Sequence, residues 1–210
     1  MRLLIFGPQA SGKGTQAARV AEHFRILHIS TGDIFRENIS QETELGKLAA
    51  SYMNDGNLVP NEVTNNLVKN RLEEEDCAKG FILDGYPRTR NQAEFLTELN
   101  HKFDAAINLQ VSESEIIKRI GARRICENCK TGFNTIFIKP KVEGVCDKCN
   151  GKLIIREDDK PEAIKKRLSL YHELTEPLLD FYREKGLIVD INGDPIMDEV
   201  YAEIIQKLSA

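Results

Sequence analysis

A glycine-rich loop between a predicted strand and a predicted helix is the feature that most restricts how this chain can fold. The loop reads GPQASGKGTQ from Gly7 to Gln16, and it follows the apolar run 3–6, which is typical of a buried parallel strand. From Lys13 onward apolar residues recur every three or four positions, which predicts a helix. Backbone N–H groups of such a loop converge on an anion, and the positive end of the helix adds to the attraction. The stretch therefore predicts a nucleotide phosphate site, with Lys13 as a mobile charge for the outer phosphates.

Thr15, the hydroxyl-bearing residue of this loop, stands one position later than in the usual phosphate-loop pattern. The usual pattern is G-x-x-x-x-G-K followed at once by Ser or Thr, whereas here Gly14 follows the lysine and Thr15 comes next. In many such loops the residue after the lysine binds Mg²⁺ directly. Either Thr15 reaches the metal, or Mg²⁺ is held by phosphate oxygens and water.

The rest of the chain alternates predicted strands with predicted helices. Further strands are predicted at residues 26–30, 81–83, 105–111 and 187–191. Helices are predicted from residue 34, with Asp33 as N-cap, and at 45–54, 61–75, 91–99, 113–124, from Pro161 onward and at 199–208. Pro177 predicts a kink or break in the helical region after Pro161. This alternation predicts an α/β fold, with a five-stranded parallel sheet flanked by helices on both faces.

Composition narrows the function classes. Of the 210 residues, 41% are hydrophobic and 30% charged, which allows a real core in one domain with insertions. The net charge of −4 argues against a general nucleic-acid binder. No stretch approaches the roughly 20 apolar residues of a membrane helix, and the short apolar start reads as a strand and not as an export signal. We therefore expect a cytoplasmic protein without nucleic-acid or membrane partners, and nothing indicates more than a monomer.

Four of the five cysteines form two C-x-x-C pairs inside a segment that has no helical period. The pairs are Cys126 with Cys129 and Cys146 with Cys149, separated by short glycine-punctuated stretches that predict a small β-rich insertion. This spacing is typical of a closed, structural Zn²⁺ site, with iron as an alternative metal. Two disulfides or four free thiols are the other interpretations, and a reducing cytosol disfavours disulfides. Cys77 lies outside the cluster and is expected to be a small buried apolar residue.

Arginines are the other residues that indicate a binding or catalytic function, because their planar guanidinium groups bind phosphate oxygens in pairs. The candidates are Arg36, Arg88, Arg119, Arg123, Arg156 and Arg167. Arg119 and Arg123 are four apart on a predicted helix and would share one face. A solvated basic surface is the plain alternative for such residues.

Several ordered motifs, taken together, resemble the adenylate kinase family from end to end. They are GPQASGKGTQ, ISTGDIFR, GFILDGYPRT with Gln92, RIGARR, and REDD followed by KKRL. The family loop commonly reads G-x-P-G-x-G-K-G-T, so the late threonine fits the family pattern. This chain departs from that pattern in having Pro8 one place early, Gln9 for Pro and Ala10 for Gly. Ala10 must avoid a positive φ or accept some strain.

The resemblance implies a kinase that transfers a phosphoryl group reversibly from ATP to AMP, giving two ADP, with Mg²⁺. It implies a core (1–29, 60–121 and 161–210), a helical AMP-binding segment (30–59) and a β-rich lid with the metal site (122–160). The implied ATP-binding residues are Ala10, Ser11, Gly12, Lys13, Gly14, Thr15, Arg119, Arg123, Gly132, Phe133 and Pro195. The implied AMP-binding residues are Thr31, Arg36, Asn57, Leu58, Val59, Gly85, Tyr86, Pro87, Arg88, Gln92, Arg156 and Arg167. The implied catalytic residues are Lys13, Asp84, Arg88, Arg123, Arg156 and Arg167.

Individual roles follow from the same resemblance. Arg119 would stack on the ATP adenine, Phe133 would close over that base, and Gln92 would read the AMP adenine edge. Asp84 ends a strand, where it could orient magnesium-bound water or simply cap a turn. Asp158 and Asp159 could hold the lid closed, cap the helix that follows, or do both.

Two alternatives remain at this point. The acceptor could be another monophosphate such as UMP or CMP, although Thr31 and Gln92 favour adenine and the long lid is unlike that of the pyrimidine enzymes. The chain could also be a zinc-ribbon binding module that holds nucleotide only as a ligand, which the acidic net charge and the arginine set oppose.

Overall fold

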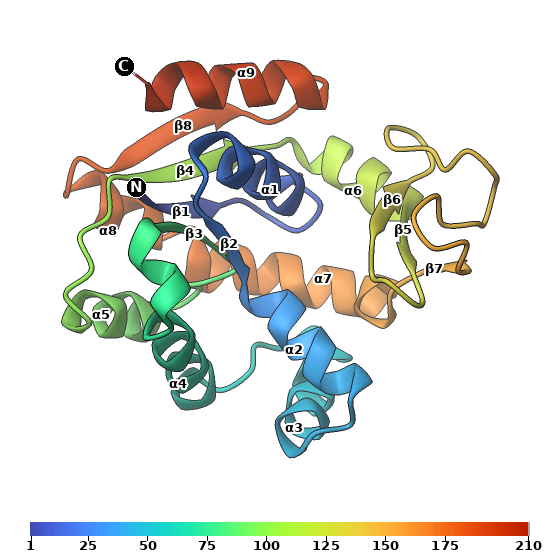
Figure 1. The fold of residues 1–210 in the computed structure, drawn as a ribbon, viewed down its shortest axis with the longest axis horizontal. Helices are drawn as coiled ribbons and strands as arrows, with labels where there is room; N and C mark the ends of the chain where they lie inside the picture. The colour runs from blue at the N-terminus through green and yellow to red at the C-terminus, as the bar shows by residue number, and fades with distance from the viewer. Residues whose placement is uncertain (210) are drawn as a thin grey trace.

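The fold is that of a computed structural model, which describes residues 1–209 apart from the side chain of Glu157 (Figure 1). Its centre is a five-stranded parallel sheet in the order β2-β3-β1-β4-β8. The strands are β1 (Arg2–Phe6), β2 (Leu27–Ser30), β3 (Phe81–Asp84), β4 (Ala105–Gln110) and β8 (Ile188–Asn192). The predicted sheet is thus confirmed, with boundaries that differ by one or two residues.

Helices cover both faces of the sheet because alternate side chains of each strand point in opposite directions. Leu3 and Ile5 pack under α1 (Lys13–Phe24) and α9 (Met197–Leu208). On the opposite face, Leu4 and Phe6 pack with three further helices, which are α4 (Asn61–Leu72), α5 (Arg90–Glu98) and α8 (Leu178–Arg183). The apolar run of β1 is therefore explained by burial on both faces of the sheet.

The first strand occupies the position at which the order of the sheet reverses. After β1 the chain builds β2 and β3 on one side, and β4 and β8 on the other. The loop that follows β1 therefore lies at a topological switch point, where open parallel sheets bind ligands. The register pairs Ile5 and Ser30 with Asp84, so three strands end side by side at this edge.

Two short helices project from this edge, α2 (Thr31–Ser40) and α3 (Glu44–Met53) (Figure 1). They enclose a small core of Phe35, Ala49 and Val59. Gly46 allows them to approach closely, because a Cβ there would lie 2.1 Å from the carbonyl oxygen of Asn38. Residues 31–59 thus form a compact helical segment.

A second projection, here called the lid, follows α6 (Glu113–Ala122) (Figure 1). It is an antiparallel sheet in the order β6-β5-β7. Its strands are β5 (Arg123–Cys126), β6 (Gly132–Asn134) and β7 (Leu153–Ile154). The chain returns to the core through η2 (Glu157–Asp159) and α7 (Pro161–Leu170). The predicted β-rich insertion is therefore present.

The remaining elements connect these parts. The 3-10 helix η1 (Glu75–Lys79) precedes β3, and the π-helical turn η3 (Tyr171–Thr175) joins α7 to α8. Pro177 stands directly before α8, so the predicted break is confirmed. Across residues 1–209, no helix combines the length and the apolar character that crossing a membrane requires.

Two sequence predictions about helix ends were wrong. The predicted helix 113–124 ends at Ala122, because the backbone becomes extended at Arg123, which pairs with Asn134 in the lid sheet. Arg119 and Arg123 therefore do not share a helix face. In α2 the N-cap is Ser30 and not Asp33, since the Ser30 hydroxyl accepts a hydrogen bond from the Asp33 N–H.

Candidate active site

The phosphate loop adopts a tight, partly strained conformation. Gly12, the N-cap of α1, has a φ of 92°, and Ala10 has a φ of 57°. The Pro8 carbonyl accepts hydrogen bonds from the Ser11 N–H at 3.2 Å and from the Lys13 ammonium at 3.0 Å. Ala10 thus takes the left-handed conformation that glycine tolerates best, and the backbone accepts the strain.

The close approach of β3 to α1 explains why glycine follows the loop lysine. A Cβ on Gly14 would lie 3.2 Å from Oδ2 of Asp84, a distance tighter than most real Cβ contacts. A serine or threonine here would press its side chain against this carboxylate. Glycine at this position therefore lets the Asp84 carboxylate approach the start of α1.

Asp84 is a buried carboxylate between two basic groups. Its Oδ2 lies 3.4 Å from Nε2 of His28, and 7% of the residue is exposed. Burial alone would raise the pKa of Asp84, but the hydrogen bond with His28 and the charge of Lys13 outweigh burial and lower it. Asp84 is therefore held ionised beside the phosphate loop.

Lys13 lies in a strongly cationic environment. Burial lowers its pKa from 10.5 to about 7, and the positive charges of Arg88, Arg167 and Arg123 add to this effect, while Asp84 opposes it. These groups converge from four parts of the chain, namely α1, the loop after β3, α7 and β5. Burying several positive charges together destabilises the folded protein when no anion is bound. The cluster is therefore suited to binding an anion.

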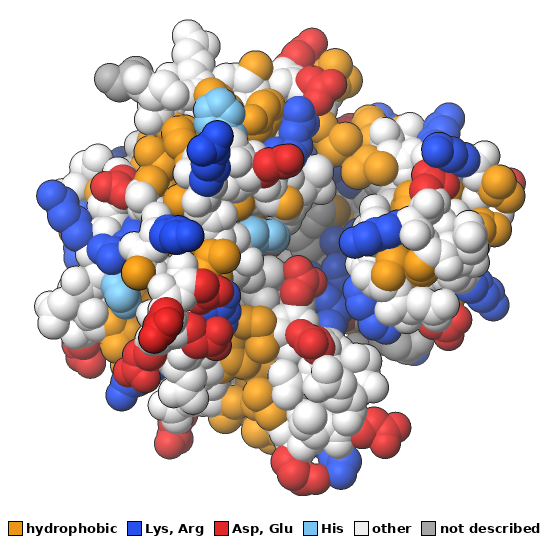
Figure 2. All heavy atoms as spheres, viewed as in Figure 1, with side chains coloured by type: hydrophobic (Ala, Val, Ile, Leu, Met, Phe, Trp, Pro, Cys, Tyr) orange, Lys and Arg blue, Asp and Glu red, His pale blue; other side chains and the backbone are white. Residues whose placement is uncertain are grey.

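A cavity beside the loop is lined by Gln9, Lys13, Arg88, Arg167 and Tyr171 among others. Figure 2 shows a hollow between the core, the helical segment and the lid, with basic and acidic side chains along its edge. Three of the predicted catalytic residues thus face one space.

A second cavity brings together most of the predicted AMP residues. It is lined by Thr31, Gly32, Phe35, Met53, Asn57, Leu58, Val59, Thr64, Gly85, Arg88 and Gln92. Gln92 is fixed in orientation, because its Oε1 accepts from the Arg88 N–H at 2.8 Å and its Nε2 donates to Asn61 at 3.0 Å. The Thr31 hydroxyl and the Arg88 Nε both donate to the Gly85 carbonyl, at 3.0 and 2.7 Å.

Five predicted AMP residues lie apart from the lining of the second cavity, namely Arg36, Tyr86, Pro87, Arg156 and Arg167. The Tyr86 ring is 1% exposed, its hydroxyl donates to Asn65, and it lines the first cavity with Pro87. Arg36 pairs with Asp33, one helical turn earlier. Burial and the nearby charge of Arg156 lower the pKa of Arg36.

Sequence reasoning missed several residues that shape the second cavity. Gly32, Phe35, Met53 and Thr64 line it, and Asn61 holds the Gln92 amide. Phe35 could have been found, because it stands in the ISTGDIFR motif four residues after Thr31. Met53 and Thr64 carry no local signal, since only the packing of α3 and α4 brings them to the cavity.

Arg119 joins three parts of the molecule near the predicted ATP adenine site. Its guanidinium donates to the Ser11 carbonyl at 3.2 Å, to the Gly193 carbonyl at 2.9 Å and to the Asp194 carbonyl at 3.1 Å. Pro195 follows these carbonyls directly. The Arg119 guanidinium also lies 5.7 Å from the ring centre of Phe137 in the lid.

Phe133 was predicted to close over the ATP base, and in this structure it lies in the interior of the lid. The ring is 6% exposed and packs with Cys126, Cys146 and Leu153 in the interior of the lid. Alternation along β6 explains this orientation, since Gly132 is exposed and Phe133 is buried. The lid aromatic that faces Arg119 is Phe137.

Two carboxylates form ion pairs with the arginines around the lid. Arg123 pairs with Asp159, Arg156 donates to Asp158 at 2.7 Å, and Arg167 donates to Asp158 at 2.9 Å. Burial opposes ionisation of Asp158, but Arg156 and Arg167 outweigh it and lower the pKa of that carboxyl. Lys160 is the N-cap of α7, and both aspartates before it pair with arginines.

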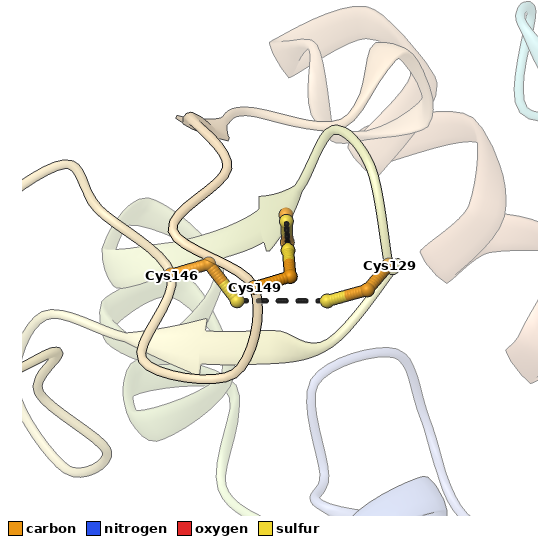
Figure 3. A group of neighbouring side chains, drawn as sticks. Cys129, Cys146 and Cys149 are labelled. Carbon is orange, nitrogen blue, oxygen red and sulfur yellow. Dashed lines mark hydrogen bonds between the residues drawn. The ribbon is translucent and has the colours of Figure 1, made fainter.

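The four cysteines of the lid converge with their sulfurs facing one another (Figure 3). All four Sγ atoms lie within 4.8 Å of one another, with separations of 3.4 Å for Cys126–Cys149 and 3.5 Å for Cys129–Cys146. Tetrahedral Zn²⁺ with bonds of about 2.3 Å would place sulfurs about 3.8 Å apart, so the set fits zinc. Within residues 1–209 no disulfide is formed, and Cys77 is buried as expected.

Phosphoryl transfer needs positive charge around the moving group and protection from water, and this chain provides charge beside its phosphate loop. Together with the parallel sheet and the loop at its switch point, this arrangement places the protein among the P-loop phosphotransferases that act on nucleotides.

Comparison with known proteins defines the family. The family model "Adenylate kinase" matches residues 5–187. Curated adenylate kinases from Caldanaerobacter subterraneus subsp. tengcongensis and Streptomyces coelicolor are each 51% identical, over 212 and 213 residues, covering 99% of this chain and 96% and 98% of the relatives. The adenylate kinase of Archaeoglobus fulgidus is 50% identical over 208 residues, covering 97% of this chain and 96% of the relative.

The chain therefore belongs to the adenylate kinase family. The phosphotransferase class and the kinase function expected from the sequence are confirmed. The family binds ATP, AMP and ADP, and uses Mg²⁺ with ATP.

Proposed function

We propose that this chain transfers a phosphoryl group between ATP and AMP across the first cavity, with the residues that follow in defined roles. The observation that supports this proposal best is the convergence of Lys13, Arg88 and Arg167 on the first cavity, with the charge of Arg123 close enough to act on Lys13. Such a cluster neutralises the charge that spreads over the phosphoryl oxygens in the transition state.

The ATP half of the site is proposed to be the phosphate loop, residues 10–15, with Arg119 and the turn before Pro195. Backbone N–H groups of the loop and the start of α1 would bind the phosphates, and Lys13 would leave the Pro8 carbonyl to reach them. The carbonyls near Pro195 and the Arg119 plane would border the adenine. Gly132 would contribute only backbone at this border.

Bound with ATP, Mg²⁺ would neutralise phosphate charge. Asp84 fits an outer role toward Mg²⁺, because it is held ionised next to Gly14 and can accept hydrogen bonds from water. His28 would keep the Asp84 carboxylate in this orientation.

The AMP half is proposed to be the second cavity. Thr31, residues 57–59 and Gln92 would surround the adenine, while Arg36, Arg88, Arg156 and Arg167 would bind its phosphate. Gly85, Tyr86 and Pro87 would form the wall between the two nucleotides. The fixed Gln92 amide supports adenine over pyrimidine, since an oriented donor and acceptor pair discriminates between base edges.

Residues 30–59 and 122–160 are proposed to move as the AMP-binding segment and the lid relative to the core (1–29, 60–121 and 161–210). Closure would bring Arg123, Arg156 and the carboxylates of Asp158 and Asp159 over the nucleotides. This movement would exclude water, so that the phosphoryl group passes to AMP and not to solvent.

The cysteine cluster is proposed to hold a structural Zn²⁺ that stabilises the lid. Four thiolates fill a tetrahedral metal, so no position remains for substrate. Hydrogen bonds from Thr131 lower the pKa of Cys129 to about 6, which favours the thiolate form that binds metal. We also propose that the protein acts as a cytoplasmic monomer.

The experiment is a coupled assay of ADP formation from Mg-ATP with AMP, UMP or CMP, with metal analysis of the same sample. We expect AMP to be the preferred acceptor and about one zinc per chain, as four ligands imply. Faster turnover with UMP or CMP would overturn the acceptor assignment. Binding of ATP without turnover by a folded, metal-loaded protein would indicate a nucleotide-binding module instead.

A further inference from the structure

Gln9 is a buried polar residue of the phosphate loop, and none of the proposed roles in nucleotide binding or catalysis involves it. The residue is 6% exposed, and its Nε2 donates to the carbonyl of Ile164 in α7 at 2.7 Å. Its Oε1 is buried and has no hydrogen-bond partner among the described residues. A buried amide oxygen without a partner is costly, so it calls for a partner in some state of the enzyme.

The surroundings of Gln9 restrict what that partner can be. Gln9 lines the first cavity together with Lys13, Arg88 and Arg167, which are all donors. Arg167 stands three residues after Ile164 on α7, so the bond from Nε2 to Ile164 holds the Gln9 amide within one helical turn of Arg167. The hydrogen bonds described for Arg167 all use Nη1, and all go to Asp158.

We propose that Gln9 is a positioning residue for Arg167. When phosphates draw the Arg167 guanidinium away from Asp158, Gln9 Oε1 accepts one of its N–H groups and fixes the plane of the fork. The opposite edge of the guanidinium then faces the transferring phosphoryl group, which is the geometry a bidentate contact needs. This inference rests on the proposed role of Arg167 in binding that group.

The same bond connects the helix that follows the lid to the phosphate loop. The Ile164 carbonyl belongs to the helix that follows the lid, and Gln9 belongs to the loop that binds ATP phosphates. Gln9 therefore links the helix that follows the lid to the loop that is proposed to hold ATP, through the Nε2 end of its amide.

The test is a double-mutant cycle between Q9M and R167K, measured as kcat and KM for ATP and AMP. Methionine matches the length of glutamine and removes both polar atoms, and lysine keeps the charge of arginine but loses the fork. We expect Q9M to lower kcat about tenfold to a hundredfold, as loss of a hydrogen bond to a charged group implies, with both KM values within about threefold. In the R167K background, Q9M should lower kcat by no more than about twofold, because its target is gone.

Gln16 provides a matched control. It is 2% exposed, its Nε2 donates to the Met197 carbonyl at 2.9 Å, and its Oε1 also lacks a described partner, but it faces α9 and not Arg167. Any effect of Q16M on kcat should therefore multiply with that of R167K. Thermal unfolding should show similar losses of stability for Q9M and Q16M, since each loses one buried hydrogen bond.

The outcomes are distinguishable. If the effects of Q9M and R167K on kcat multiply, as those of Q16M and R167K should, Gln9 has a purely structural role and the inference is wrong. If R167K keeps full kcat, the role assigned to Arg167 is wrong as well, and an unmodified enzyme without AMP kinase activity would instead refute the proposed function. Q9L, which has a similar volume, replaces Q9M in the same cycle if Q9M does not fold.

Discussion

Replacing Lys13 by methionine should destroy activity and yet stabilise the nucleotide-free protein. Burial and the neighbouring arginines lower the pKa of Lys13 from 10.5 to about 7. Each unit of pKa is worth about 1.4 kcal/mol, so a charged Lys13 costs the folded state at most about 5 kcal/mol. Because part of the Lys13 side chain remains accessible to solvent, we expect about 2 to 3 kcal/mol.

The sign of the pH dependence follows from the lowered pKa. Below pH 7 Lys13 is charged in both the folded and the unfolded chain, so the full cost applies. Between pH 7 and 10.5 the folded protein holds Lys13 neutral while the unfolded chain keeps its proton, and the free energy of unfolding of the native protein rises with pH. The advantage of K13M should therefore be about 2 to 3 kcal/mol at pH 6, smaller at pH 9, and absent above pH 10.5.

The assay is urea unfolding of the metal-loaded, nucleotide-free protein at both pH values, followed by far-ultraviolet circular dichroism because the chain has no tryptophan. K47M serves as control, since Lys47 is an exposed lysine on α3 that pairs with Glu44. It should change the free energy of unfolding by less than about 0.5 kcal/mol at either pH. Equal stability of K13M and the native protein at pH 6, or the same difference at both pH values, would refute the reasoning.

Three further substitutions test other parts of the site. Arg88→Ala should raise KM for AMP by about a hundredfold and leave the Kd for ATP within about threefold, because the Arg88 side chain lines the second cavity and donates to the Gly85 carbonyl. Steady-state kinetics and ATP titration measure both, and equal losses would contradict the assignment. Cys129→Ser should release zinc on dialysis and lower Tm while low-temperature turnover stays mostly intact; complete inactivation of the folded variant would indicate a catalytic metal instead. Ala10→Gly should raise the free energy of unfolding by about 1 kcal/mol, because Ala10 has a φ of 57°; a decrease in urea unfolding would show that the loop is not strained there.

The sheet and the phosphate loop could be predicted because their signals are local. The central strands β1, β3 and β4 are short, mostly apolar runs, and burial on both faces leaves little choice of structure. The signal of the cysteine cluster is also local, since each C-x-x-C pair places two sulfurs near each other in the sequence.

The end of α6 could not be predicted, because the helical pattern runs past it. Ile116 and Ile120 are buried on one face, and the charged residues beyond them continue the pattern. The chain leaves the helix because Arg123 and Arg124 pair with β6, and this pairing depends on residues ten positions later. Tertiary contacts here override local propensity.

The orientations of the lid aromatics could not be predicted from the sequence for a similar reason. Phe133 and Phe137 are both lid phenylalanines that follow the first cysteine pair, and only the pairing of β6 with β5 shows that Phe133 faces the sulfurs. Likewise, the resemblance placed Asp84 near Mg²⁺, but the reason for glycine at position 14 became visible only in the distance to Asp84.

The pairing of Arg123 with Asp159 has a consequence for how the lid is attached to the rest of the chain. These residues open β5 and close η2, so the lid leaves and re-enters the core at a single point. The entropy of closing such a loop grows only slowly with its length, by about 0.6 kcal/mol per doubling. The core is therefore almost indifferent to how many residues the lid contains, and the lid can lengthen, shorten or be exchanged during evolution as a cassette as long as its two ends stay joined.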